Sequence, residues 1–288
     1  MQKNIISLFW RISRPYRLFQ LLAIFFPILA VTTNNLAAPY VLAQSLNTLQ
    51  RGTVTFENSA SILLAYGGLL VFGEIILWRL ALYFCWTFEI ASMRDLYSFV
   101  FRKLSRESLH FHSDRFTGSL VSQASKLQGS FERFWDMIIW SITPMLTMTF
   151  GAIIIIATLG YWQYSLVILA TAVLFATTVL LSSRFLAAYN TREAQASTAN
   201  SGYLADVLTN IVTVKSFGKE LYEDSQAREL ASQWHAASSK LKWGVLGATG
   251  AYSVFLVIIR LAALLFAVYI AQKGIVSVGI AYLLLAYS

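Results

Sequence analysis

An uncharged run of 47 residues, from position 137 to 183, is the strongest constraint on how this 288-residue chain can fold. As a single α-helix the run would be about 70 Å long, whereas the hydrocarbon core of a bilayer is only about 30 Å thick. Residues 160–163, Gly-Tyr-Trp-Gln, punctuate its middle. Glycine accommodates a tight turn, and tyrosine and tryptophan favour the level of the lipid headgroups. The run therefore predicts two membrane helices joined by a very short turn.

The charge content of the whole chain supports the same interpretation. Hydrophobic residues make up 57% of the sequence and charged residues only 12%. A soluble domain carries about 25% charged residues. The composition thus excludes an ordinary soluble domain and indicates that most of the length crosses a membrane.

The uncharged tracts divide the chain into six crossings. We expect an all-α membrane protein with six long transmembrane helices and two extended cytoplasmic loops, forming one domain over residues 1–288. Pro27 and Pro39 should bend the first helix. The last segment is only about 22 Å long as a helix, less than a crossing needs, so we expect the chain to stop inside helix six. The expected helices lie at about 18–50, 57–107, 119–159, 162–208, 219–272 and 275–288.

The basic residues indicate the orientation of these crossings. Of the 22 lysines and arginines, 18 lie in the first 17 residues and in the stretches 84–136 and 184–242. The positive-inside rule places these three segments in the cytoplasm of a multi-pass protein in the cell membrane. Because the basic residues follow the topology and form no single patch, the net charge of +8 does not indicate nucleic-acid binding.

The two inner connections, 53 and 59 residues long, contain no proline and show helical periodicity. We therefore expect crossings two to five to continue as helices into the cytoplasm. Each connection has one break, at 110–118 and at 209–218, which could hold a short helix. Ser113 or Asp114, and Thr209 or Asn210, are the expected N-caps, and glycines 118 and 218 the expected ends.

The apolar side chains at these breaks leave two interpretations open. Phe111, Phe116, Ile211 and Phe217 either form a docking surface for a cytoplasmic partner or pack the two helical tips together. The first interpretation is compatible with a membrane receptor or scaffold that binds a signalling protein.

The residues at both breaks resemble the intracellular-loop signatures of ATP-binding cassette (ABC) exporters. The second-loop resemblance is carried by Asn210, Ile211, Val214, Lys215, Phe217 and Glu220. The weaker first-loop resemblance is carried by Phe111, Thr117, Gly118, Leu120 and Ser122. Ser113, Gln123 and Leu127 stand where that family usually has charged residues, so the family's salt bridges are not expected here.

The resemblance implies the transmembrane domain of a type 1 half-transporter, which works in a homodimer or heterodimer by alternating access. Its substrate would be a lipid, drug, peptide or similar amphipathic molecule. The two breaks would be coupling helices that contact a nucleotide-binding domain. Their expected contact residues are Phe111, His112, Ser113, Asp114, Arg115 and Phe116 in the first loop, and Thr209, Asn210, Ile211, Val212 and Thr213 in the second.

ATP hydrolysis would belong to the complete transporter. No G-x-x-x-x-G-K-[ST] phosphate loop occurs in the 288 residues, so we expect no cofactor in this chain. ATP and Mg²⁺ are expected on the nucleotide-binding domain. That domain would either follow Ser288 in the same polypeptide or be a separate chain.

Ionisable residues inside the crossings are further candidates, because charge in a bilayer is costly and commonly functional. Glu74 and Arg260 lie at similar expected depths, so they could pair within a chain or across a dimer, or face the cavity. Arg79 can reach the inner interface, and we assign it no role. Glu132 and Asp136 are interpreted as a solvated or cavity-edge face.

We expect no metal site. His110 and His112 have a spacing that does not place two ligands on one helical face, and His235 has no partner ligand in the sequence pattern. Cys85 is the only cysteine and is interpreted as a small buried residue.

Overall fold

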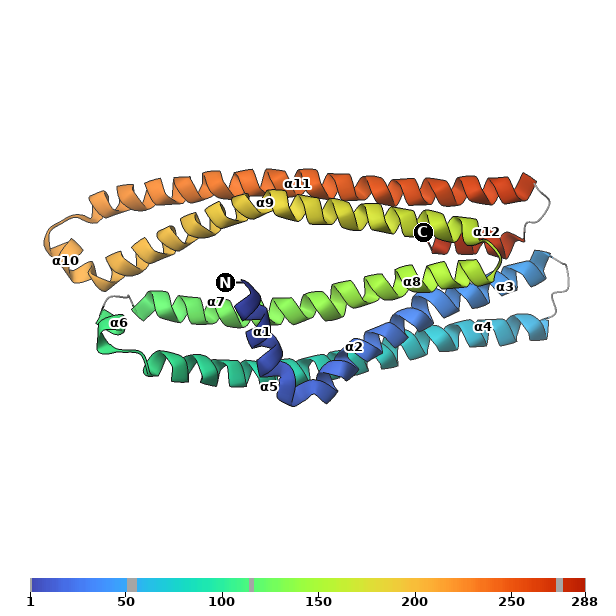
Figure 1. The fold of residues 1–288 in the computed structure, drawn as a ribbon, viewed down its shortest axis with the longest axis horizontal. Helices are drawn as coiled ribbons and strands as arrows, with labels where there is room; N and C mark the ends of the chain where they lie inside the picture. Colours follow the sequence, from blue (N-terminus) through green and yellow to red (C-terminus); the bar gives the residue numbers. More distant parts are fainter. Residues whose placement is uncertain (1, 51–55, 114–116, 273–276, 288) are drawn as a thin grey trace. The chain divides into compact units, whose positions relative to one another are not determined.

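The computed structural model describes residues 2–50, 56–113, 117–272 and 277–287, and every regular element in these ranges is a helix (Figure 1). The predicted all-α fold is therefore confirmed. Contacts divide the chain into two units. Unit 1 comprises residues 1–100, 128–173 and 256–288, and unit 2 comprises residues 101–127 and 174–255.

The first helical stretch of unit 1 begins before the expected position 18. The 3₁₀ turn η1 contains Pro15 and separates the first two helices. Between Pro27, which is buried inside α2, and Pro39 the chain forms a π-helix, η2. The elements are α1 (Gln2–Ser13), η1 (Arg14–Tyr16), α2 (Arg17–Val31), η2 (Thr32–Ala37) and α3 (Ala38–Gln50).

The next two helical stretches each contain a π-helix as well. The first consists of α4 (Phe56–Leu70), η3 (Val71–Leu77) and α5 (Trp78–Ser105). The second consists of α7 (Thr117–Asp136), η4 (Met137–Ile142) and α8 (Thr143–Thr158). Both η2 and η4 end two residues before a proline, Pro39 or Pro144. A proline has no N–H and its ring crowds the carbonyl four residues earlier, so a widened turn relieves both problems.

The turn between α8 and α9 (Trp162–Thr209) lies where the uncharged run predicts it. Gly160 has a φ of +91°, a conformation that favours glycine. Its N–H bonds to the Ala157 carbonyl at 3.0 Å, and the Ser165 hydroxyl bonds across the hairpin to the Ile153 carbonyl at 3.0 Å. The two legs are therefore held together directly at the turn.

The core of unit 1 gathers around α3, α8 and α12 (Val278–Ala286). Asn47 accepts a hydrogen bond of 2.8 Å from the backbone N–H of Gly279, and the Tyr287 hydroxyl donates one of 2.6 Å to the Leu36 carbonyl. These bonds attach the last helix to the first stretch. The buried residues of this core are Leu36, Ala43, Ala152, Ile156, Tyr164, Ile168, Ala263, Ala267, Ile270, Leu283, Leu284 and Tyr287.

Unit 2 contains the two short helices α6 (Leu109–Ser113) and α10 (Ile211–Ser216). Helix α9 lies beside α11 (Glu220–Gln272), and α10 connects them (Figure 1). Several side-chain contacts hold α9 to α11 within unit 2. The ring of Phe175 lies 5.6 Å from that of Tyr252, Trp234 Nε1 donates a 2.9 Å hydrogen bond to Glu193, and Tyr203 donates one to Glu223.

Five helical stretches of the described chain are long and apolar enough to cross a membrane. They span Ile5–Thr48, Ala60–Ser105, Gln123–Thr158, Trp162–Thr209 and Glu220–Ile270. Helix α12 has only nine residues. The protein is thus a multi-pass membrane protein, while the count of six crossings and their exact limits stay predictions.

Candidate functional site

The break between α9 and α10 is made by Asn210, with φ −101° and ψ 18°. Its side chain does not cap α10. The amide instead donates backward to the carbonyl and the carboxylate of Asp206, at 3.1 Å each. Thr209 likewise bonds back to the Ala205 carbonyl at 2.7 Å. Both expected N-cap side chains therefore close the end of α9 and leave the first N–H groups of α10 free of a side-chain cap.

The other end of α10 is a Schellman motif. Gly218 has a φ of +60°, as the position after a helix end often requires. Its N–H bonds to the Lys215 carbonyl at 3.2 Å, and the N–H of Lys219 bonds to the Val214 carbonyl at 3.0 Å. The predicted end of this short helix at Gly218 is confirmed, and its direction is fixed by backbone bonds.

Helix α10 presents apolar side chains on its outer surface. Val214 is buried and anchors the helix, whereas the exposed fractions of Val212 and Phe217 are 76% and 74%. Large apolar side chains that are this exposed at a helix end outside the apolar spans can mark a protein contact surface. Ile211 is half-buried and Thr213 is exposed. We call Val212, Thr213 and Phe217 the α10 tip.

A hollow of about 340 Å³ lies at the base of the α10 tip. Tyr203 and Glu223 line it, and their hydrogen bond joins α9 to α11 next to the short helix. The sequence did not single out this pair, because twenty residues separate its members and neither belongs to the loop signature. The other lining residues are Asp206, Val207, Asn210, Thr213, Val214, Phe217 and Lys219.

The first break lies a few residues earlier than predicted. Helix α5 ends at Ser105, and the Ser108 hydroxyl accepts a 3.2 Å hydrogen bond from the N–H of Phe111 at the start of α6. The cap is therefore Ser108, not Ser113, which is the last residue of α6. Phe111 and His112 lie in α6 as well, and the expected end at Gly118 lies inside α7. Asp114, Arg115 and Phe116 lie outside the described residues.

The intramembrane pair of Glu74 and Arg260 is not formed within the described part of this chain. Glu74 lies in η3 and accepts a 2.9 Å hydrogen bond from the side-chain amide of Asn34 in η2. Arg260 is exposed on α11. Pairing across a dimer and a position in the cavity stay predictions for both residues.

An apolar groove of about 760 Å³ runs along unit 1 beside η2. Hydrocarbon side chains dominate its lining, with three threonines and one tyrosine as polar groups. Such a surface suits the apolar part of an amphipathic molecule. The groove is lined by Ile28, Thr32, Leu36, Ala37, Tyr40, Val41, Leu146, Thr147, Phe150, Gly151, Ile154, Ile155 and Thr158.

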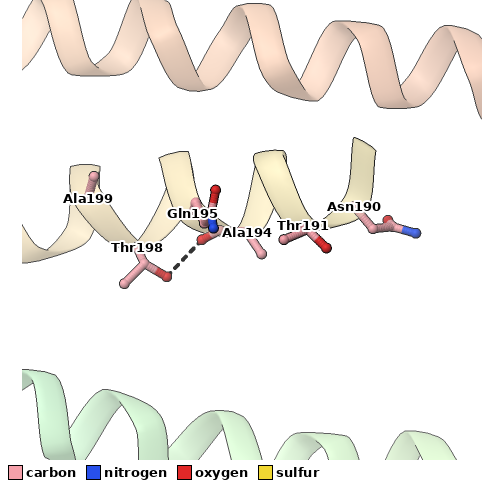
Figure 2. A pocket seen from close by; sticks show the side chains of 6 residues that line it. All are labelled: Asn190, Thr191, Ala194, Gln195, Thr198 and Ala199. Carbon is pink, nitrogen blue, oxygen red and sulfur yellow. Dashed lines mark hydrogen bonds between the residues drawn. The ribbon is translucent and has the colours of Figure 1, made fainter. Parts of the chain in front are cut away.

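Between positions 190 and 199, one side of α9 carries small and polar residues. Asn190, Thr191, Ala194 and Thr198 project from α9 on the side away from α11 (Figure 2). The hydroxyls of Thr191 and Thr198 are bonded to carbonyls one turn earlier, at 3.0 and 2.8 Å. The side chains are therefore compact, and a surface of this kind lets another helix approach closely.

Three comparisons with known proteins bear on this arrangement. Residues 21–288 match the model of a family described as the ABC transporter transmembrane region. Comparison with curated proteins gives no match. Among solved structures, the chain is similar to that of a bacterial Atm1-family ABC exporter with ATP bound, with a TM-score of 0.80 and 17% identity. That similarity covers 95% of this chain and 48% of the exporter chain, so this chain spans about half of that protein's length.

Proposed function

The chain belongs to the ABC transporter transmembrane region family, and we propose that it forms the substrate-translocating, membrane-spanning part of an ATP-driven exporter. The observation that carries this proposal is the α10 tip. Its exposed Val212 lies on a short helix and its exposed Phe217 directly after that helix, whose ends are fixed by Asn210 and Gly218. A rigid apolar tip between two long helices suits a partner domain that pushes on it.

The partner that we propose is a nucleotide-binding domain, which binds ATP and Mg²⁺ and contacts α10 and α6. It is either part of the same polypeptide or a separate chain. Helices α9 and α11 are unbroken over 48 and 53 residues, so each can carry a movement of the α10 tip along its axis. The nucleotide-binding domain would supply the energy of ATP hydrolysis, and this chain would convert that energy into a change of its own conformation.

We propose that two such transmembrane domains, identical or different, assemble around the transport pathway. The small-residue side of α9 supports this assembly, because compact side chains allow close helix contact. Transport by alternating access requires two conformations with different affinities for substrate. The apolar groove beside η2 supports an amphipathic substrate, such as a lipid, drug or peptide.

We place the N-terminus and both short helices in the cytoplasm of a cell-membrane protein. The positive-inside distribution of lysine and arginine supports this orientation. It puts the α10 tip on the side where ATP is available. Export from the cytoplasm follows from the resemblance of both loops to those of exporters.

Coupling can be tested in proteoliposomes that contain this chain together with its nucleotide-binding domain. Phe217→Ala and Val212→Ala should leave basal ATP hydrolysis intact and abolish its stimulation by substrate, together with transport. The matched control is Leu246→Ala, which changes an exposed apolar residue of α11 away from the short helix. Transport at the wild-type rate in the double variant Val212→Ala/Phe217→Ala would contradict the proposed docking at the α10 tip.

A further inference from the structure

Three potential metal ligands meet inside unit 1. Cys85 and Glu89 are one turn apart on the buried side of α5, and Asp136 is the last residue of α7. One ligand atom from each side chain lies within 4.8 Å of the other two. Cys85 is 0% exposed and Glu89 5%, while Asp136 is half-buried. The group is thus a compact, largely buried cluster of one thiol and two carboxyl groups.

This cluster has more acceptors than the surrounding protein satisfies. Oε1 of Glu89 is buried and has no hydrogen-bond partner within the described ranges. Asp136 accepts a 3.1 Å hydrogen bond from the indole N–H of Trp140. The ion pairs found in the described chain, Arg94 with Asp95 and Arg228 with Asp224, involve neither carboxyl group. A buried carboxylate this close to a second one is repelled strongly unless a proton or a cation lies between them.

We infer that Cys85, Glu89 and Asp136 bind a divalent transition-metal ion of the zinc type. A thiolate combined with two carboxylates matches the sulfur and oxygen ligands that zinc accepts, and the sulfur disfavours magnesium or calcium. An ion placed among three atoms that are at most 4.8 Å apart lies within about 2.8 Å of each, so small side-chain shifts reach the usual zinc distances of about 2.0–2.3 Å. A water molecule can complete the coordination, and the thiol releases its proton on binding.

The geometry favours a resident ion over transported cargo. The ligands come from two helices, so the ion would join α5 to α7 directly before the π-helix η4. The indole of Trp140, in η4, orients one carboxylate in the way that outer hydrogen bonds orient metal ligands. The site departs from our sequence expectation of no metal and is independent of the proposed export activity.

The test uses the chain purified in detergent, with any affinity tag removed and metal stripped by a chelator. Titration with Co²⁺ should produce the near-ultraviolet absorption of a cobalt–thiolate bond, and elemental analysis after Zn²⁺ loading should give one ion per chain. Cys85→Ser should remove the absorption. Glu89→Gln and Asp136→Asn should each weaken binding at least about tenfold. The matched control is Glu132→Gln, one turn earlier on α7 and exposed, which should bind as wild type does.

Thermal unfolding separates metal binding from misfolding of a variant. Zn²⁺ should raise the midpoint of the wild type and of Glu132→Gln, and leave that of Glu89→Gln unchanged. Absence of cobalt absorption in the wild type, or equal Co²⁺ affinity in wild type and Glu89→Gln, would overturn the inference. A Glu89→Gln variant that melts above the wild type, with no effect of Zn²⁺ on either, would also overturn it. That result would show that a proton on Glu89 satisfies the cluster instead.

Discussion

The side-chain amide of Asn34 donates a 2.9 Å hydrogen bond to the carboxylate of Glu74. The bond joins two π-helical segments, η2 and η3, from successive crossings. The backbone of η3 leaves room for it at Gly73, where a Cβ atom would lie only 1.8 Å from Oδ1 of Asn34. A neutral amide thus holds the carboxylate of Glu74 without a second charge in the same place.

Removal of the amide should cost measurable stability. We expect Asn34→Ala to lower the free energy of unfolding in detergent by about 0.6 kcal/mol, and by no more than about 1.7 kcal/mol, the range of polar bonds between membrane helices. The matched control is Asn35→Ala, an exposed neighbour in the same π-helix, which should have no comparable effect. In a double-mutant cycle with Glu74→Ala, purely additive losses would show that the bond contributes nothing.

Features that a few neighbouring residues determine could be predicted from the sequence. The turn at Gly160 could be predicted because the length of the uncharged run demands it, and the end of α10 because Gly218 follows the signature. The predicted position of the first break is wrong because Ser108 and Ser113 are equally suitable N-cap residues by sequence. Only the structure shows that the N–H of Phe111 donates to the Ser108 hydroxyl. Turns and helix ends marked by one local signal can therefore be predicted from the sequence. The choice between two equivalent N-cap residues cannot.

Contacts between distant residues could not be predicted in the same way. The bond between Asn34 and Glu74 depends on the register of two π-helices, and only η2 has a proline to signal its widened turn. The cluster around Glu89 was missed for a related reason. Cys85 and Glu89 share a helical face by their spacing, but nothing local shows that this face meets Asp136.

Gly279 should be intolerant of any side chain. A Cβ atom there would lie 2.1 Å from the backbone carbonyl oxygen of Ala43 and 2.6 Å from Oδ1 of Asn47. The backbone of Ala43 cannot rotate away as a side chain could, so Gly279→Ala must move α12 away from α3. We expect this to lower the free energy of unfolding by about 1–3 kcal/mol. Gly250→Ala is the control, since nothing lies within 4 Å of its Cβ position, and it should stabilise α11 by about 0.5–1 kcal/mol. Equal midpoints of thermal unfolding for the two variants would contradict this packing.

Gly218 should control the order of the α10 tip. Its φ of +60° is costly for alanine by about 1–2 kcal/mol, and asparagine tolerates the conformation better. We expect Gly218→Ala to speed hydrogen exchange of the α10 amides markedly and Gly218→Asn to do so less. Gly202→Ala, at an open position inside α9, should leave that exchange unchanged. The measurement compares the hydrogen-exchange rates of the α10 amides in the two Gly218 variants. Equal rates in both would show that the left-handed conformation of Gly218 does not hold the α10 tip in place.

The orientation of the chain determines whether the α10 tip can meet a cytoplasmic motor. Cys85 is fully buried, so a cysteine introduced at the exposed Lys215 should be the only accessible thiol. We expect Lys215→Cys to react with a membrane-impermeant maleimide in inverted vesicles and not in intact cells. A cysteine in place of the exposed Trp162, at the start of α9 beside the turn on the opposite side, should show the reverse pattern. Labelling of Lys215→Cys in intact cells would place α10 outside the cell, where no ATP-driven domain could act on it.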